Sequence, residues 1–199
     1  MERIVRIPQQ KRSIEKKNKI LDAAYIIFNT KGYYNTSTAE IAVNAGISTG
    51  SLYAYFKDKK ELFIEIINKF TDKLLELMII KFEEIPENKD ISVIISSSIN
   101  MFVESHEMSK KLHEEIMALS HLDEEIRILF IEQRKRMINE ISKQFKKRQI
   151  IMENEQEKLF IMYLTIDSIC NEFIYDNKTG YDKNTIINEC AVLLKKLIS

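Results

Sequence analysis

The fold is decided by residues 36–62, which read Thr36-Ser37-Thr38-Ala39-Glu40-Ile41-Ala42-Val43-Asn44-Ala45-Gly46-Ile47-Ser48-Thr49-Gly50-Ser51-Leu52-Tyr53-Ala54-Tyr55-Phe56-Lys57-Asp58-Lys59-Lys60-Glu61-Leu62. Ser37 and Glu40 have the spacing of a capping box, so we expect a helix to begin at Thr38. Gly46 has no Cβ and therefore permits a sharp turn, after which Ser48 can cap a second short helix. Two short helices joined in this way form a helix-turn-helix, whose second helix enters the major groove of DNA.

The second of these helices and its flanks carry side chains suited to DNA. Small residues in its first turn let the backbone approach a base pair, and the hydroxyl and ammonium groups that follow are typical phosphate ligands. We expect Thr49, Ser51 and Tyr53 to contact bases, and Tyr55 and Lys59 to contact phosphates. A helical hairpin with a solvated, charged end is the plainer alternative, but caps, turn and basic edge coincide here. The predicted DNA-binding set is Thr36, Ser37, Ser48, Thr49, Gly50, Ser51, Tyr53, Tyr55, Lys57 and Lys59.

A series of short sequence features extends around this stretch, from residue 20 to residue 62. In chain order they are Ile20-Leu21-Asp22-Ala23-Ala24, Phe28, Gly32-Tyr33, Thr36-Ser37, Ile41-Ala42, Ala45-Gly46-Ile47-Ser48, Leu52-Tyr53-Ala54-Tyr55-Phe56, Lys59 and Leu62. The combination resembles the TetR family of bacterial transcriptional regulators, over about the first third of the chain. One departure is Thr38, where that family usually carries an apolar residue, so we expect looser packing there. The resemblance implies repression as the usual outcome.

Charge is distributed unevenly along the 199 residues, although the formal net charge is zero. Residues 1–60 contain 11 Lys and Arg against 5 Asp and Glu, whereas residues 61–199 contain 19 against 25. A basic end on an acidic body is typical of a protein that presents one end to a polyanion. We divide the chain into a basic flexible arm (1–13), a helix-turn-helix DNA-binding domain (14–60) and a helical effector-binding and dimerisation domain (61–199).

The N-terminal arm and the first helix support the DNA-binding interpretation. The arm shows no helical period, and its basic residues are Arg3, Arg6, Lys11 and Arg12. It is interpreted either as a solvated tail or as an arm that follows the DNA backbone or minor groove. From residue 14 to residue 31 the apolar positions have helical spacing, and Gly32 supplies the C-terminal cap.

The rest of the chain has an entirely helical pattern and few breakers, with 4 Gly and 2 Pro in the whole sequence. A helix from about residue 58 to residue 84 is stopped before Pro86 and joins the two domains. Five more helices are expected over residues 90–106, 109–119, 122–149, 154–176 and 183–197. The fold class is therefore all-α with about nine helices, without an internal repeat or a glycine-rich phosphate loop.

The last two predicted helices favour a homodimer. Residues 159–175 are apolar around most of the helix circumference, and such a helix must be buried on nearly all sides. One side can face its own core and the other a partner chain. Together with residues 183–197 it can form half of a four-helix dimer interface, which is also where the TetR family dimerises.

Methionine, aromatic and polar side chains in the predicted domain 61–199 mark a candidate effector site. Thr165, Asp167 and Asn171 lie in the most apolar helix, where a polar group needs a partner. They either hydrogen-bond across the dimer seam, which we favour, or face a ligand cavity. Aromatic and methionine stripes are more often core. The candidate ligand-binding residues are Phe102, His106, Met117, Phe130, Met137, Tyr163, Asp167 and Asn171.

Neither metal binding nor catalysis finds support in the sequence. His106, His113 and His121 are spaced by seven and eight residues, but a predicted break near Ser120 interrupts their helix and no Cys is near. Cys170 and Cys190 lie in apolar patterns and are interpreted as small hydrophobic residues in a reducing compartment. No Ser/His/Asp or Cys/His pattern is present. We therefore expect no enzyme, no cofactor and no metal.

The function that these observations favour is a TetR-like transcriptional regulator of double-stranded DNA. It would bind a palindromic operator as a homodimer and be released by a small, largely apolar ligand. The sequence shows no signal-peptide pattern and no apolar run long enough to span a bilayer. We therefore expect a cytoplasmic protein without membrane contact. A ligand-independent architectural or co-regulatory DNA-binding protein is one alternative. A helical enzyme or metal-binding protein is another.

Overall fold

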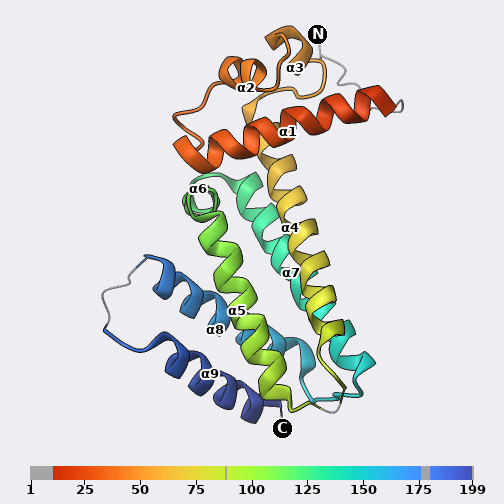
Figure 1. Ribbon diagram of the computed structural model, residues 1–199, viewed down its shortest axis with the longest axis vertical. Helices are drawn as coiled ribbons and strands as arrows, with labels where there is room; N and C mark the ends of the chain where they lie inside the picture. Colours follow the sequence, from red (N-terminus) through yellow and green to blue (C-terminus); the bar gives the residue numbers. More distant parts are fainter. Residues whose placement is uncertain (1–10, 88, 176–179, 199) are drawn as a thin grey trace. The chain divides into compact units, whose positions relative to one another are not determined.

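The computed structural model describes residues 11–87, 89–175 and 180–198, which form nine helices and no strand (Figure 1). The helices are α1 (Lys11–Lys31), α2 (Thr38–Asn44), α3 (Thr49–Leu52), α4 (Lys59–Glu84), α5 (Ile91–Met108), α6 (Lys110–Leu122), α7 (Glu124–Lys147), α8 (Glu155–Tyr175) and α9 (Lys183–Ile198). The predicted all-α fold is confirmed. Among the helices in these ranges, none has the length and apolar character needed to cross a bilayer.

Several helix boundaries differ by a few residues from the sequence prediction. α1 begins at Lys11, so the last three residues of the predicted arm are helical, whereas residues 1–10 lie outside the described residues. The predicted break near Ser120 is wrong, because α6 continues to Leu122 and the break falls at Asp123, whose backbone is extended (φ −126°, ψ 119°). α7 ends at Lys147, and Gln149 then adopts a positive φ of 58°.

The chain divides into two compact units that are not contiguous in sequence. Among the described residues, unit 1 contains those from Lys11 to Thr71 together with Ser109–Phe130. Its core holds the aromatic rings of Phe28, Phe56 and Phe63, and α6 and the start of α7 add four apolar side chains to it. These four are Leu112, Ile116, Leu119 and Ile126. α6 is therefore part of the same packed body as the helix-turn-helix.

Unit 2 contains Asp72–Met108 and the residues from Ile131 onward. In it α5 packs against both α8 and α9. The end of α4 is held by Arg148, whose guanidinium donates to the carbonyl of Phe82, to that of Ile85 at 2.6 Å and to that of Pro86 at 3.3 Å. Phe82 lies in the last turn of α4, and Ile85 and Pro86 follow the helix, so Arg148 ties the helix end and the segment after it to the end of α7.

Candidate functional site

The helix-turn-helix in unit 1 is built from two serine caps. The Ser37 Oγ accepts from the Glu40 amide at 3.2 Å, and α2 follows. The Ser48 Oγ accepts from the Ser51 amide at 3.2 Å, and α3 follows. Gly46 turns the chain between them with a φ of 67°, a conformation that costs little without a Cβ. The predicted caps and turn are confirmed.

The first turn of α3 brings together the small residues that the sequence assigned to base contact. Ser48 and Gly50 are exposed, while Thr49 and Ser51 are half-buried. The Ser48 hydroxyl also donates to the Ser51 hydroxyl at 3.0 Å. Ser37 and Lys57 are exposed as well. A short, small-residue helix start with accessible hydroxyls is the kind of surface that can approach base edges closely.

Thr38, which departs from the family pattern, has a specific partner. Its Oγ1 lies 2.9 Å from the hydroxyl of Tyr53, so the two side chains join α2 to the end of α3. An apolar residue at position 38 would leave this tyrosine hydroxyl without that contact. The polar residue is therefore explained by a cross-helix hydrogen bond, which fixes α3 against its supporting helix.

Two other predicted DNA-binding residues point into the unit. The Thr36 side chain is only 3% exposed, and its hydroxyl donates to the Gly32 carbonyl at 2.7 Å. Tyr55 is 9% exposed, and its hydroxyl lies 3.0 Å from the Ser13 Oγ. Both hydroxyls thus contribute to the scaffold that carries α3. Sequence spacing alone could not predict that the Tyr55 hydroxyl faces inward, because its partner Ser13 is 42 residues away in the chain.

Lys59 also faces inward. Its ammonium group donates to the Tyr33 carbonyl at 2.8 Å and to the Thr36 carbonyl at 2.9 Å. The same nitrogen lies 4.3 Å from the centre of the Tyr33 ring, within the range of a cation–π interaction. Burial lowers the pKa of Lys59. The sequence predicted a phosphate contact here, whereas the structure gives this lysine three partners inside unit 1.

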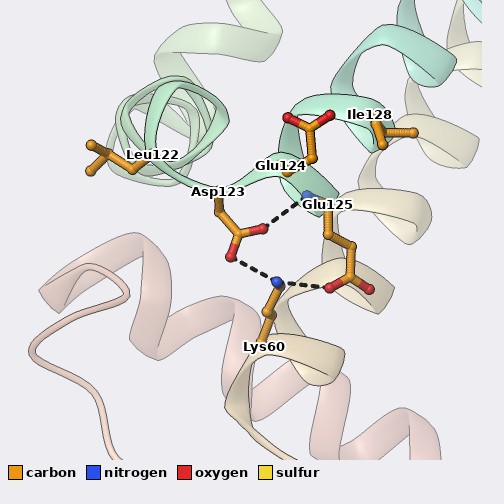
Figure 2. Close-up of a pocket in the computed structure, with 6 residues that line it drawn as sticks. All are labelled: Lys60, Leu122, Asp123, Glu124, Glu125 and Ile128. Carbon is orange, nitrogen blue, oxygen red and sulfur yellow. Dashed lines mark hydrogen bonds and ion pairs between the residues drawn. The ribbon is translucent and has the colours of Figure 1, made fainter.

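An ion-pair cluster that the sequence did not indicate lies at the junction of α6 and α7 (Figure 2). The Lys60 Nζ is 2.7 Å from one carboxylate oxygen of Asp123 and 2.7 Å from one of Glu125. Hydrogen bonds to Asp123, then to Glu125, raise the pKa of Lys60, and the bond to Lys60 lowers that of Asp123. Asp123 also accepts from the amides of Glu125 and Ile126 and so caps α7. An open surface depression flanks the cluster.

The candidate effector residues are divided between the two units. Met117 and Phe130 belong to unit 1, and the other six belong to unit 2. Phe102 and Tyr163 line a cavity of about 20 Å³ among α4, α5, α7 and α8. Their rings meet edge to face, with centroids 6.2 Å apart. Met137 is in the surrounding core. The cavity has roughly the volume that one water molecule needs.

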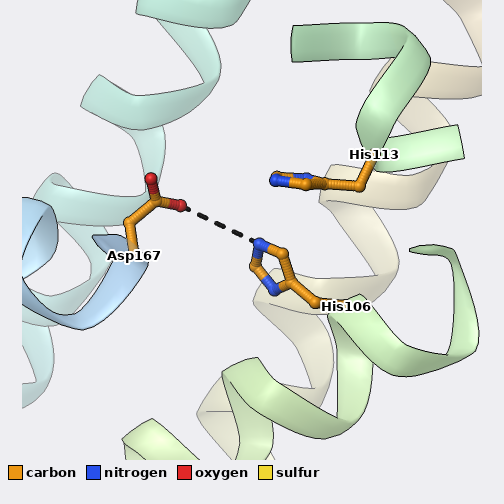
Figure 3. A group of neighbouring side chains, drawn as sticks. All are labelled: His106, His113 and Asp167. Carbon is orange, nitrogen blue, oxygen red and sulfur yellow. Dashed lines mark ion pairs between the residues drawn. The ribbon is translucent and has the colours of Figure 1, made fainter. Parts of the chain in front are cut away.

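His106, Asp167 and Asn171 form a polar cluster in unit 2. The His106 Nδ1 donates to the Phe102 carbonyl at 2.7 Å, and its Nε2 faces the Asp167 carboxylate at 3.8 Å (Figure 3). Asn171 donates to the second oxygen of this carboxylate at 3.3 Å. Burial raises the pKa of Asp167, and His106 opposes this rise. Thr165 donates to the Ile161 carbonyl at 2.8 Å, within its own helix.

Known proteins resemble the chain most clearly over the helix-turn-helix. Residues 20–66 match the family model for bacterial regulatory proteins of the tetR family. The fatty acid metabolism regulator protein of Bacillus subtilis (strain 168) is 28% identical over 92 residues, which are 46% of this chain and 47% of that protein. The HTH-type transcriptional regulator AcrR of Shigella flexneri is 46% identical over 52 residues, which are 26% of this chain and 24% of that protein. The chain thus spans about half or less of the length of these curated relatives.

The likeness in fold extends further than the likeness in sequence. The fatty acid degradation regulator FadR from Bacillus halodurans superposes with a TM-score of 0.67 and 20% identity, over 90% of this chain and 94% of that one. The residues matched by the family model include the two capped helices described above. Residues 20–66 of this chain are thus similar to the tetR family of bacterial regulatory proteins, and the fold of the remaining helices is similar to that of FadR.

Proposed function

We propose that this chain is a homodimeric repressor that inserts two copies of α3 into successive major grooves of a palindromic operator. The observation that carries the proposal is the pair of serine-capped helices, with the small first turn of α3 exposed or half-exposed. Two such helices can bind together only if their separation matches the DNA repeat, about 34–36 Å per turn. Repression is the usual outcome in this family.

Within this proposal the predicted DNA-binding residues have different roles. Thr49, Ser51 and Gly50 form the first turn of α3 and are the proposed base-reading residues, with Tyr53 beside them. Ser37, Ser48 and Lys57 are exposed and are proposed to contact phosphates. Thr36 and Tyr55 act through the scaffold, because their hydroxyls are held inside unit 1. The proposed functional division remains DNA binding in residues 14–60 and effector binding with dimerisation in residues 61–199.

Dimerisation is proposed to use the exposed faces of α8 and α9. Both helices keep large apolar side chains at the surface although their other sides pack into the core of unit 2. The exposed set is Phe160, Ile161, Leu164, Val192 and Leu193, and Leu193 is 62% exposed. Apolar side chains grouped on two neighbouring helices are typical of a protein–protein interface. The core-facing residues of the same helices, such as Leu194, already have partners within the chain.

The proposed effector is a largely apolar small molecule that binds in unit 2. The cavity among α4, α5, α7 and α8 is lined by Met78, Phe82, Ile95, Phe145 and other apolar groups. An acyl chain suits such a lining, and two similar proteins are named as regulators of fatty acid metabolism or degradation. Because the cavity measures only about 20 Å³ here, binding requires that these helices move apart. The polar cluster around His106 and Asp167 is the proposed site for the ligand's polar end.

A ligand-independent DNA-binding protein is the second candidate, and the small cavity favours it. A drug-sized ligand occupies a pocket of roughly 300–1,000 Å³, far more than the space among these helices. Under this alternative, the cluster of His106, Asp167 and Asn171 is a structural part of a packed core and binds no ligand. DNA binding would then have no small-molecule release.

Selection from a random DNA pool, followed by release assays, tests both candidates. The dimeric protein should enrich a palindromic sequence and bind it in a salt-dependent manner. Palmitate, palmitoyl-coenzyme A and shorter acyl homologues are then titrated into the complex. Release by a compound that also raises the melting temperature supports the effector site. An enriched operator that no acyl compound releases favours the ligand-independent candidate, and no enrichment contradicts DNA regulation altogether.

A further inference from the structure

Lys59 is the first residue of α4, yet its ammonium group is used inside unit 1. The two carbonyls that it binds belong to Tyr33 and Thr36, in the segment between α1 and α2. The Tyr33 ring beneath it packs against Phe28 and Phe63 of the core. The ammonium group therefore connects the start of α4 to a segment 23 and 26 residues earlier in the chain.

One of these carbonyls lies directly before the start of α2. Thr36 immediately precedes Ser37, the residue whose side chain caps α2. α2 is in turn joined to the end of α3 by the hydrogen bond between Thr38 and Tyr53. A change at Lys59 would thus be passed through the α2 cap to the orientation of α3. Hydrogen bonds from a charged donor to buried acceptors are among the stronger ones in proteins.

We infer that Lys59 is a positioning residue that orients the helix-turn-helix, and that it is not a phosphate anchor. This inference rests on the proposed DNA binding. A phosphate anchor contributes equally to all sequences and to the salt dependence of binding, because it releases counterions. A positioning residue instead contributes to the preference for the operator over other DNA, since it places the base-reading side chains.

The exposed Lys57, two residues before Lys59 in the chain, provides a matched control. Wild type, Lys59→Met and Lys57→Met are titrated with the selected operator and with a scrambled duplex over a series of salt concentrations. Lys57→Met should weaken binding to both duplexes by the same factor. It should also lower the steepness of log affinity against log salt concentration by about 1. Lys59→Met should leave that slope unchanged and lower the operator preference by about tenfold. If Lys59→Met lowered the salt slope by about 1 and left the preference for the operator unchanged, the inference would be overturned.

Lys59→Arg keeps the charge and separates the two roles even if Lys59→Met does not fold. A phosphate anchor tolerates arginine, because the guanidinium group also binds phosphate. A planar guanidinium group cannot reproduce the contacts of one nitrogen with two carbonyls and the Tyr33 face. Operator preference should therefore fall in Lys59→Arg as well, and wild-type preference in this variant overturns the inference.

Amide hydrogen exchange supplies a readout that does not depend on DNA. In Lys59→Arg the amides of residues 36–42 should exchange faster than in wild type, with the amides of unit 2 unchanged. Unchanged exchange at residues 36–42 contradicts the positioning role. If wild-type protein binds no DNA, the proposed function fails, and hydrogen exchange still decides the role of Lys59.

Discussion

The side chain of Asn29 in α1 caps helix α6, which begins 81 residues later in the chain. Its Oδ1 accepts from the Leu112 amide at 3.2 Å, and the residue at the N-cap position, Ser109, makes no side-chain cap bond. The Ser109 hydroxyl lies instead 2.7 Å from the Tyr25 hydroxyl. The free amides at the start of α6 are thus partly satisfied by α1, which joins α6 to the helices of unit 1.

Removing this cap should destabilise unit 1. Asn29→Ala is expected to lower the free energy of unfolding by about 1 kcal/mol, the usual effect of losing a helix cap. Asn29→Asp should be tolerated, because a carboxylate accepts the same hydrogen bond and suits the positive end of the helix. Asn18→Ala, an exposed position on the same helix, serves as the control. Urea denaturation measures the differences, and equal effects of Asn29→Ala and Asn18→Ala would contradict the role of the cap.

The contact between Thr38 and Tyr53 should appear as a coupling free energy. Thr38→Val and Tyr53→Phe each remove one of the two hydroxyls, at an expected cost of about 0.5–1.5 kcal/mol. Because both changes break the same hydrogen bond, the double variant should cost less than the sum of the single ones. A double-mutant cycle by chemical denaturation provides the measurement. Strict additivity would show that the two hydroxyls do not stabilise the fold through each other.

The contribution of Lys60 to stability should be lost in acid. The pKa of Asp123 is lowered in the fold, so the stabilising effect of its ion pair is complete above the unfolded value of about 3.9. It disappears as the pH falls through the lower, folded pKa. Lys60→Met should therefore lower the melting temperature at pH 7 more than at pH 3. A melting-temperature difference that does not change between these pH values contradicts the assignment.

Asp167 should have the opposite pH dependence. Burial raises its pKa, so folding favours the protonated carboxyl and stability falls as the pH rises from the unfolded value towards the folded one. Asp167→Asn, which stays neutral, should be at least as stable as wild type at pH 7 and lose this advantage near pH 4. Melting curves from pH 4 to pH 8 measure the trend. A variant less stable than wild type at pH 7 would mean that the His106 pair outweighs the cost of burial.

Charge on the exposed faces of α8 and α9 should prevent dimerisation. Leu164→Glu and Leu193→Glu are expected to give folded monomers, because both side chains are exposed within the chain. Leu77→Glu, at an exposed apolar position of α4, is the control and should remain dimeric. Sedimentation at micromolar concentration distinguishes the states. A monomeric wild type would refute the proposed interface.

Local sequence features predicted the helix-turn-helix well, and long-range contacts account for what was missed. Cap spacing and a glycine turn are properties of a few consecutive residues, so Ser37, Gly46 and Ser48 could be read directly. Tyr55 faces inward because Ser13 lies beneath it, and Lys60 is paired because Asp123 is close in space. Neither partner is near in sequence. Likewise, the sequence marked α8 as apolar around most of its circumference and α9 as a second interface helix, but it could not separate the exposed Leu193 from Leu194, which is 2% exposed.

The capping of α6 by Asn29 also limits how the helix-turn-helix segment of this chain can be exchanged for that of a relative. A chimera that exchanges the segment matched by the family model, residues 20–66, for that of a relative would transplant the part of α1 that holds position 29 without α6. Leu112 and Ile116 of the recipient would then meet a foreign surface in the core of unit 1. Exchange of DNA specificity should succeed when residues 109–130 are transferred together with the N-terminal segment. The transferable module is therefore discontinuous in the gene, although it is a single body in the fold.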